Sequence, residues 1–469
     1  MGQDNKYIFD IESFDEEEIA QRKETRRKKH KKKRMMSWIF LLLFVFTIII
    51  LGYAGVKMLI KGISSKQQID TEITKETVDT GDDTSEIDKL INDEEEVVIA
   101  PPEPTEVEPT ENDLYEEAIR NYIAKMSLEE KVAGIFIVTP EQITDVDAAI
   151  RAGDGTKAAL EAYTVGGLIY GAKNMVDKDQ FSNMLAKTKE FSKYPLFLAV
   201  DEELGNSVFP KEMKVTATMT PKDIGANADP TVAYLEEEKI ANYLVSSNIN
   251  LNLGIIADPL TDADNEFMQN RSFSEDANMC GEMAAKNVNA LHEYGIYAGV
   301  KFFPGHGSAR EDTSNGLSVS TRTADEMRAC EFVSFKAAID AGADMVVVSH
   351  VSAPNLTGDN TQCSQSKYVM TDLLRNELGY NDVVIITDSL SKAAVSSYLD
   401  SKEASIHAIK AGADMVLNPE NFKEAYEGVI EAVNSGVIAK ERIDDSLLRI
   451  YKVKFKGKTT EEINALVSE

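Results

Sequence analysis

Short apolar segments recur along the chain from Leu114 onward, and each is followed by a stretch whose apolar residues have helical spacing. Strands that alternate with helices in this way are typical of repeated βα units, in which the strands form a parallel sheet. Eight strand segments can be counted, over residues 131–138, 166–171, 195–201, 249–258, 298–305, 344–351, 382–389 and 413–419. Eight βα units in about 340 residues predict an α/β fold with a single (β/α)8 barrel of the TIM type.

An open, doubly wound sheet is the structural alternative to the barrel. No GxGxxG motif follows an early strand segment, so the sequence lacks the signature of the dinucleotide-binding version of that fold. We therefore expect residues 113–469 to form one barrel.

An uncharged apolar stretch, Trp38 to Val56, precedes the barrel. At about 1.5 Å per residue it is long enough to cross a hydrocarbon core about 30 Å thick. A cleaved signal peptide is the alternative, but its apolar region is usually about 7–15 residues long, and no clear small-x-small cleavage site follows here. The pattern predicts a transmembrane helix over residues 37–61.

Basic residues are concentrated before this stretch, where ten Lys or Arg lie between Arg22 and Arg34. The positive-inside rule then predicts that residues 1–36 form a cytosolic tail and that the barrel lies outside the cell. A nuclear-localisation or nucleic-acid-binding role is the alternative, but a basic run beside a span usually sets topology and contacts anionic lipid. The formal charge of −29 for the whole chain argues against a nucleic-acid partner.

Residues 62–112 are acidic, rich in Thr and Pro, and poor in large apolar side chains. Such a composition predicts a disordered linker that holds the barrel near the membrane, with an interaction tail as the alternative. Cys280, Cys330 and Cys363 are far apart and odd in number, which argues against a disulfide framework and a zinc site. We expect all three to be small buried residues, and we expect no metal and no cofactor.

Polar residues end six of the strand segments, where active sites of (β/α)8 barrels lie. They are Asp201, Asp258, Lys301, His350, Asp388 and Asn418. Any one of them can be the N-cap of the following helix. As a group they predict an active site at this end of the barrel.

Asp388 follows a run of apolar and β-branched residues in VVIITDSLS. A rigid strand of this kind would deliver its carboxylate to the rim of the barrel, where it can attack the anomeric carbon of a sugar. This is the role of the nucleophile in a retaining glycosidase. An N-cap without chemistry is the alternative.

Residues 298–320 read AGVKFFPGHGSAREDTSNGLSVS. This segment resembles the signature of glycoside hydrolase family 3, in particular its β-N-acetylglucosaminidase branch, which runs Lys-His-Phe-Pro-Gly-His-Gly and then Asp-Ser-His. Further matches to the family are DEELG at 201–205, NRSFS at 270–274 and ITDSL at 386–390. The resemblance extends over residues 114–456.

The resemblance implies roles for four matched residues. Asp388 would be the nucleophile, whereas Asp201, Arg271 and Lys301 would hold sugar hydroxyls, for which a carboxylate and cationic donors are suited. A structural ion pair on a loop is the alternative for Arg271. Two further residues, His306 in the Gly-His-Gly turn and Asp258, are candidates for substrate binding, and His306 is also expected to hydrogen-bond neighbouring backbone.

Three positions depart from the family pattern. Phe209 replaces an expected substrate-binding arginine, Phe302 replaces an expected histidine, and Ser314 replaces the histidine that acts as general acid/base. Acid/base catalysis is typically worth about 100 to 10,000-fold, and a serine hydroxyl cannot supply it near pH 7. Glu311 and Asp312 are the substitute acids that the sequence offers, if burial raises the pKa of either carboxyl.

Two functional hypotheses follow. The first is a membrane-anchored extracellular glycoside hydrolase of the retaining type that acts on β-N-acetylglucosaminides or related glycans. The second is a catalytically impaired barrel that binds a glycan or a protein, since expected groups are lost at Phe209, Phe302 and Ser314, two of them to phenyl rings. Because aromatic faces can stack on sugars, an active enzyme of altered specificity is the alternative explanation of the two phenyl rings. A carbohydrate is the expected ligand in the first case, and the sequence identifies no protein partner.

Overall fold

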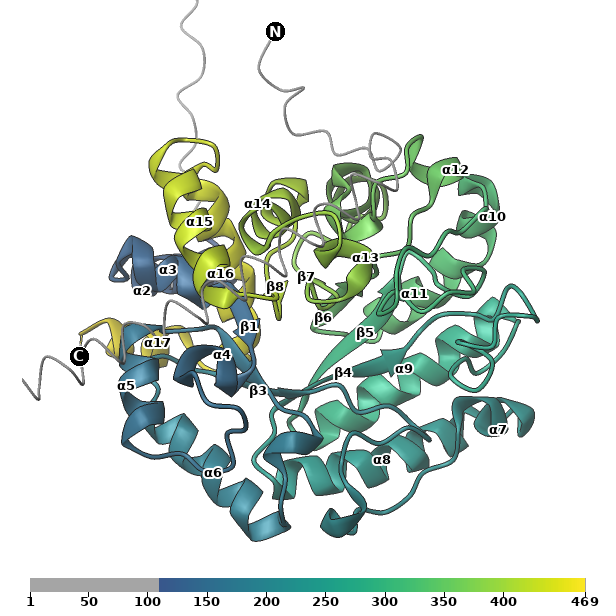
Figure 1. Ribbon diagram of the computed structural model, residues 1–469, viewed down its shortest axis with the longest axis horizontal. Coiled ribbons are helices and arrows are strands. Elements are labelled where there is room, and N and C mark those ends of the chain that lie inside the picture. Colours follow the sequence, from purple (N-terminus) through teal and green to yellow (C-terminus); the bar gives the residue numbers. More distant parts are fainter. Residues whose placement is uncertain (1–108, 469) are drawn as a thin grey trace, which may run out of the picture. The chain divides into compact units, whose positions relative to one another are not determined.

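The computed structural model describes residues 109–468, which form a nearly closed barrel of eight parallel strands (Figure 1). The strands are β1 (Phe136–Val138), β2 (Gly167–Ile169), β3 (Phe197–Val200), β4 (Leu251–Ile256), β5 (Tyr297–Phe303), β6 (Met345–Val348), β7 (Val384–Thr387) and β8 (Val416–Leu417). Strands β1 to β7 pair in the order of the sequence, and β8 pairs with β1. A parallel bridge between Ile386 and Met415 joins β7 to the segment before β8. The predicted barrel is therefore confirmed, and the open sheet is not.

Every predicted strand segment contains a strand, but the first prediction was wrong over its first half. Residues 131–134 belong to helix α3 (Leu128–Gly134), and only Phe136–Val138 is a strand. Ser127 accepts a hydrogen bond from the Glu130 amide at 3.2 Å, and the Glu130 carboxylate accepts one from the Ser127 amide at 2.9 Å. This capping box starts a helix where apolar content alone favoured a strand.

Helices lie outside the ring of strands (Figure 1). Besides α3 they are α2 (Glu111–Ala124), α4 (Pro140–Thr144), α5 (Asp154–Ala162), η3 (Ala172–Asn174), α6 (Lys178–Phe191), η4 (Lys211–Met213), α7 (Pro221–Ala226), α8 (Pro230–Ser246), α9 (Ala277–Glu293), α10 (Ala324–Ala329), α11 (Glu331–Asp340), α12 (Pro354–Thr357), η5 (Cys363–Gln365), η6 (Tyr368–Glu377), α13 (Ala393–Ser396), α14 (Ser401–Ala411), α15 (Phe422–Asn434), α16 (Lys440–Lys454) and α17 (Thr460–Ser468). Because these helices cover the barrel, strands such as β3, β6 and β7 are buried along their whole length. This explains why these strands read as continuous apolar runs in the sequence.

The first and last helices of the barrel unit pack together. Helix α2 contacts α16 and α17. The Tyr115 hydroxyl donates to the Phe455 carbonyl at 3.1 Å, and Lys452 pairs with Glu116 at 2.6 Å. Helix α2 already begins at Glu111, just before the predicted barrel boundary at residue 113.

The predicted cytosolic tail, the predicted transmembrane helix and almost all of the predicted linker lie outside the described residues. Within 109–468, no helix is long and apolar enough to cross a membrane. Cys280 and Cys363 are buried free thiols, as expected, but the prediction was wrong for Cys330, which is only half-buried at the start of α11.

A cluster of buried polar side chains joins β3, β4 and α8 below the rim of the barrel. Asn252 accepts a hydrogen bond from the Glu202 amide at 2.9 Å and donates to the Glu202 carbonyl at 3.0 Å and to the Glu237 carboxyl at 3.4 Å. Burial, together with the nearby charge of Glu202, raises the pKa of Glu237 to about 8. Glu237 therefore holds a proton at neutral pH.

We expect Glu237→Gln to stabilise the protein relative to the wild type as the pH rises. The folded wild type keeps a proton that the unfolded chain releases between about pH 4.5 and pH 8, so its stability falls across that interval. The glutamine does not titrate, and the gain should exceed about 1 kcal/mol by pH 9. Urea unfolding at pH 5, 7 and 9 measures it, and the same pH dependence in both proteins would contradict the prediction.

Candidate active site

Two cations and two carboxylates meet at the C-terminal ends of β3 and β5. The Lys301 ammonium, on β5, pairs with Asp201 and, at 2.5 Å, with Glu203. The Arg271 guanidinium binds Glu203 in a bidentate manner, with hydrogen bonds of 2.8 and 2.5 Å. The structure thus brings together Asp201, Arg271 and Lys301, as the family resemblance implies, and it also assigns Arg271 the ion pair that was the alternative for it.

Glu203 is the anion that links the two cations, and sequence reasoning missed it. Its side chain is buried, and burial by itself would raise its pKa, but Lys301 and Arg271 outweigh burial and lower the pKa to about 2. The DEELG motif contained the signal, since two further carboxylates, Glu202 and Glu203, directly follow Asp201. However, only the folded backbone determines that this carboxylate turns toward Lys301.

Asp388 lies directly after β7 and is 7 % exposed. One carboxylate oxygen accepts a hydrogen bond from the Ser389 amide at 2.7 Å, and the other accepts one from the Lys392 ammonium at 2.6 Å. Burial would raise the pKa of Asp388, but the Lys392 ammonium and the Ser389 amide hold it below its usual range. The carboxylate is therefore ionised, which is the form that a nucleophile requires.

His350 and Asn418 support the segment that follows Asp388. The His350 Nε2 donates to the Ser389 carbonyl at 2.8 Å, because a carbonyl can only accept, and this leaves Nδ1 to accept from the Ser364 hydroxyl at 2.6 Å. Burial lowers the pKa of His350, which favours this neutral form. Asn418 donates to the Ser389 hydroxyl at 3.0 Å. Both side chains are thus committed to the backbone and hydroxyls around Ser389.

Asp258 shapes the Gly-His-Gly turn from inside the protein. Its side chain is 0 % exposed and accepts hydrogen bonds from the amides of His306 at 2.5 Å and Gly307 at 3.3 Å. Gly307 lies so close to the segment that follows Asp258 that a Cβ at this position would be 1.9 Å from the Pro259 carbonyl oxygen. Asp258 therefore supports the turn and does not reach the surface of the site.

The ring of His306 is buried beside the aromatic rings of Phe267 and Phe302, at centroid distances of 4.6 and 5.5 Å. Neither ring nitrogen has a hydrogen-bond partner of normal geometry among the described residues, although the backbone of His306 and Ala309 still interacts with the ring. The aromatic neighbours offer no acceptor, and burial lowers the pKa of His306 to about 4. The imidazole is therefore neutral at pH 7.

Phe302 and Phe209, two of the departures from the family pattern, are both buried. The Phe302 ring lies among three cations, with Arg271 at 4.9 Å, Lys301 at 5.1 Å and Lys392 at 5.9 Å from its centroid. Phe209 packs edge-on against Phe181 and Tyr243. Phe302 thus provides a π face for the cations, whereas Phe209 contributes to packing.

The loop that carries Glu311, Asp312 and Ser314 lies beside the segment after Asp388. The Thr313 carbonyl accepts a hydrogen bond from the Ala394 amide of α13 at 3.0 Å. Asp312 is half-buried and accepts a hydrogen bond from the Ser314 amide at 2.8 Å. Glu311 is exposed, so it lacks the burial on which its role as an acid depended. Asp312 remains the candidate acid in this loop.

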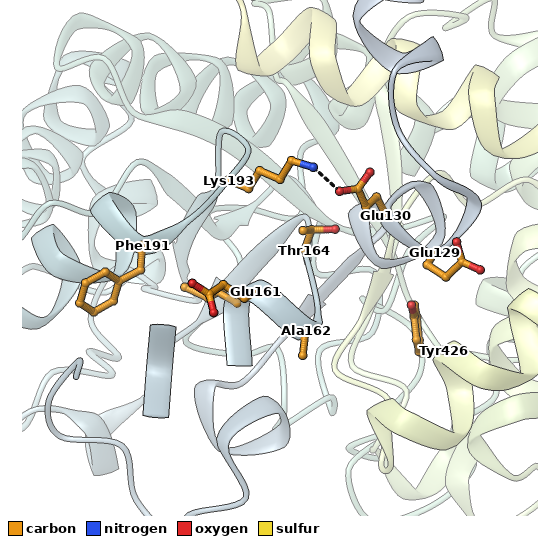
Figure 2. A pocket seen from close by; sticks show the side chains of 9 residues that line it. Glu129, Glu130, Glu161, Ala162, Thr164, Phe191, Lys193 and Tyr426 are labelled. Carbon is orange, nitrogen blue, oxygen red and sulfur yellow. Dashed lines mark hydrogen bonds and ion pairs between the residues drawn. The ribbon is translucent and has the colours of Figure 1, made fainter. Parts of the chain in front are cut away.

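A cavity of about 200 Å³ is lined mainly by residues that precede β1, β2 and β3, so it lies at the opposite end of the barrel from the charged strand-end side chains. Figure 2 shows its lining side chains. Its lining includes Ala162 and Thr164, which come shortly before β2, and Lys193, which precedes β3. Lys193 pairs with Glu130 across it at 2.5 Å. The cavity is therefore separate from the strand-end site.

Within residues 109–468, no group of three His, Cys, Asp or Glu side chains is placed to hold a metal ion.

A barrel of parallel strands with charged side chains at their carboxyl ends is the arrangement of (β/α)8 enzymes, and comparison with known proteins identifies the family. Residues 127–453 match the model of the glycosyl hydrolase family 3 N-terminal domain. The chain belongs to glycosyl hydrolase family 3.

Individual proteins that are similar to this chain include β-hexosaminidases and a β-N-acetylglucosaminidase. The chain is 32% identical to a β-hexosaminidase of Stenotrophomonas maltophilia over 279 residues, which are 58% of this chain and 81% of the relative. It is 28% identical to β-hexosaminidase A of Pseudoalteromonas piscicida over 326 residues, 63% of this chain but only 54% of that protein. A solved family 3 β-N-acetylglucosaminidase from Paenibacillus sp. str. FPU-7 superposes with a TM-score of 0.66 at 27% identity, covering 73% of this chain and 68% of the other.

We expect Glu203→Gln to lower the free energy of unfolding at pH 7 by about 3 kcal/mol, because Lys301 and Arg271 lose the buried anion that they share. The control is Asp201→Asn, which should cost less than about 1 kcal/mol, since the Asp201 side chain is 49 % exposed.

The folded-state pKa of Glu203 is depressed, so its contribution is complete above about pH 4.5 and is lost as the pH falls toward 2. Urea unfolding of the three proteins at pH 7 and pH 3 measures both effects. Equal costs for the two substitutions at pH 7 would show that Glu203 does not hold the site together.

Proposed function

We propose that the chain is a glycoside hydrolase of the retaining type that acts on β-N-acetylglucosaminides or related glycans. The observation that carries this proposal is the ionised Asp388 carboxylate at the end of β7, held by the Ser389 amide and by Lys392. The β-hexosaminidase relatives support the choice of sugar.

In the first step, an oxygen of Asp388 bonds to the anomeric carbon while the bond from that carbon to the leaving oxygen breaks. In the second step, water attacks the same carbon and the carboxylate is released. Asp201 is exposed enough to accept a hydrogen bond from a sugar hydroxyl. Arg271 has five N–H donors, of which Glu203 takes two, so others remain for the substrate.

Proton transfer is the weak part of this mechanism. Ser314 cannot protonate the leaving oxygen, and His306 is neutral and buried. Asp312 is the remaining candidate acid/base in the loop beside α13. We therefore propose that the enzyme favours substrates whose leaving group departs with little protonation.

We further propose that the barrel is anchored to the cell membrane through the apolar stretch Trp38 to Val56, with its N-terminus in the cytosol and the barrel outside. The support is the sequence alone: the length of the apolar stretch and the basic run between Arg22 and Arg34 that precedes it.

A catalytically impaired barrel that binds a glycan or a protein is the second candidate function. The observation that favours it is the filled centre of the site, where buried Phe302 lies among Arg271, Lys301 and Lys392 and both oxygens of Asp388 already have donors. The two candidates differ in whether Asp388 reacts.

We expect the purified full chain to release the phenol from an activated aryl N-acetylglucosaminide, because such a leaving group needs little protonation. Asp388→Asn should abolish this release, since an amide is a poor nucleophile. Absorbance of the released phenol measures the rate, with an activated aryl glucoside as the parallel substrate. Circular dichroism of the variant serves as the folding control. If neither glycoside gives release that depends on Asp388, the hydrolase proposal is wrong for these sugars.

We expect Ser314→His to raise the rate on an unactivated N-acetylglucosaminide by about 10-fold or more, because it supplies an imidazole beside Asp312. The rate on the activated aryl substrate should change much less, since that substrate needs little acid assistance. Comparison of kcat/KM for the two substrates measures the difference. No gain on the unactivated substrate would mean that the loop does not present residue 314 to the leaving oxygen.

A further inference from the structure

Lys392 forms an ion pair with the proposed nucleophile and helps to keep its carboxylate ionised. It lies four residues after Asp388, at the N-terminus of α13, and its ammonium is 2.6 Å from one carboxylate oxygen of Asp388. The two side chains are 22% and 10% exposed, respectively. A charged hydrogen bond in such a protected position is stronger than one at an open surface.

The other charged and titratable groups around Asp388 have partners of their own. Arg271 is engaged by Glu203, and His350 is neutral and donates to the Ser389 carbonyl. Among the described residues, Lys392 is therefore the full positive charge that is hydrogen-bonded to this carboxylate.

A direct role for Lys392 as the missing acid does not fit its position. In a retaining enzyme the acid and the nucleophile lie about 5–5.5 Å apart, because they work on opposite faces of the sugar ring. The Lys392 ammonium contacts the nucleophile itself at 2.6 Å. Any effect of Lys392 on the reaction must therefore pass through Asp388.

The charge of Asp388 changes in opposite directions in the two steps. When its oxygen bonds to the anomeric carbon, the carboxylate becomes a neutral ester, and the electron pair of the broken bond leaves with the aglycone oxygen. When water attacks, a new bond forms from the water oxygen to the anomeric carbon. The ester bond then breaks, its electron pair returns to the carboxylate, and the water proton passes to solvent. A neighbouring cation opposes the first change and assists the second.

We propose that Lys392 is a positioning residue that speeds the second step, by stabilising the Asp388 carboxylate as it departs from the anomeric carbon. This role rests on the proposed hydrolase function. With serine at position 314, no histidine takes the proton from the attacking water in the second step. Lys392 offsets part of this loss of base catalysis, because the leaving carboxylate departs toward an ammonium that is already in place.

The test is pre-steady-state release of the phenol from an activated aryl N-acetylglucosaminide by the full chain, with Lys392→Met as the variant. Methionine keeps the length of the side chain and removes its charge. In the wild type we expect no burst, because the second step is assisted. In K392M we expect a burst that approaches one phenol per protein, followed by steady turnover at least about 10-fold slower, as expected for the loss of one charge-assisted hydrogen bond.

Lys392→Arg is the matched control, since it restores the charge and should return the kinetics toward those of the wild type. Asp388→Asn in each background measures the release that does not depend on the nucleophile, and this background is subtracted. A merely structural effect of K392M would lower the burst rate and the steady rate together, without a rise in burst amplitude, and would overturn the proposal.

The remaining outcomes separate this role from the proposed function. Release that depends on Asp388, with the same burst amplitude in the wild type and in K392M, would overturn the role of Lys392 and leave the hydrolase function intact. No Asp388-dependent release from any of the proteins would overturn the hydrolase function and, with it, this role.

Discussion

The rim of this barrel is organised around one buried carboxylate, that of Glu203, which two cations share. Lys301 comes from β5 and Arg271 from the loop between β4 and α9, so the ion pairs hold together segments that are far apart in the chain. A buried cation without an anion is costly. The positions of both cations, and of the Phe302 ring that they cover, therefore depend on Glu203.

Asp388 is likewise a buried carboxylate that is stabilised by a cation. Lys392 and the Ser389 amide hydrogen-bond to the charged carboxylate, while His350 and Asn418 hydrogen-bond to the carbonyl and the hydroxyl of Ser389. The site thus has a complete set of groups to hold a charge on Asp388 but, in the mechanism that we propose, a sparse set to move a proton. In that mechanism, turnover depends on how the proton is transferred.

Most of the fold could be predicted from the sequence, because the strands are almost wholly buried and so read as apolar runs. The error at residues 131–134 arose because a capping box at Ser127 and Glu130 overrides apolar content locally. The site was predicted less completely. Asp201, Arg271, Lys301 and Asp388 lie at the rim as expected, but Glu203 and Lys392 were missed, and Asp258 is turned inward to hold the His306 loop.

The sequence by itself determined the barrel, the family and the positions of the charged residues along the strands, since these follow from periodicity and from motifs of adjacent residues. Only the tertiary structure decided which charges neutralise one another. The pairing of Glu203 with Arg271 and Lys301 joins residues far apart in the chain, and their distance depends on how the strands close into a ring. Burial determines the protonation state of His306: an imidazole that could carry a proton in water is neutral where it is buried beside two aromatic rings.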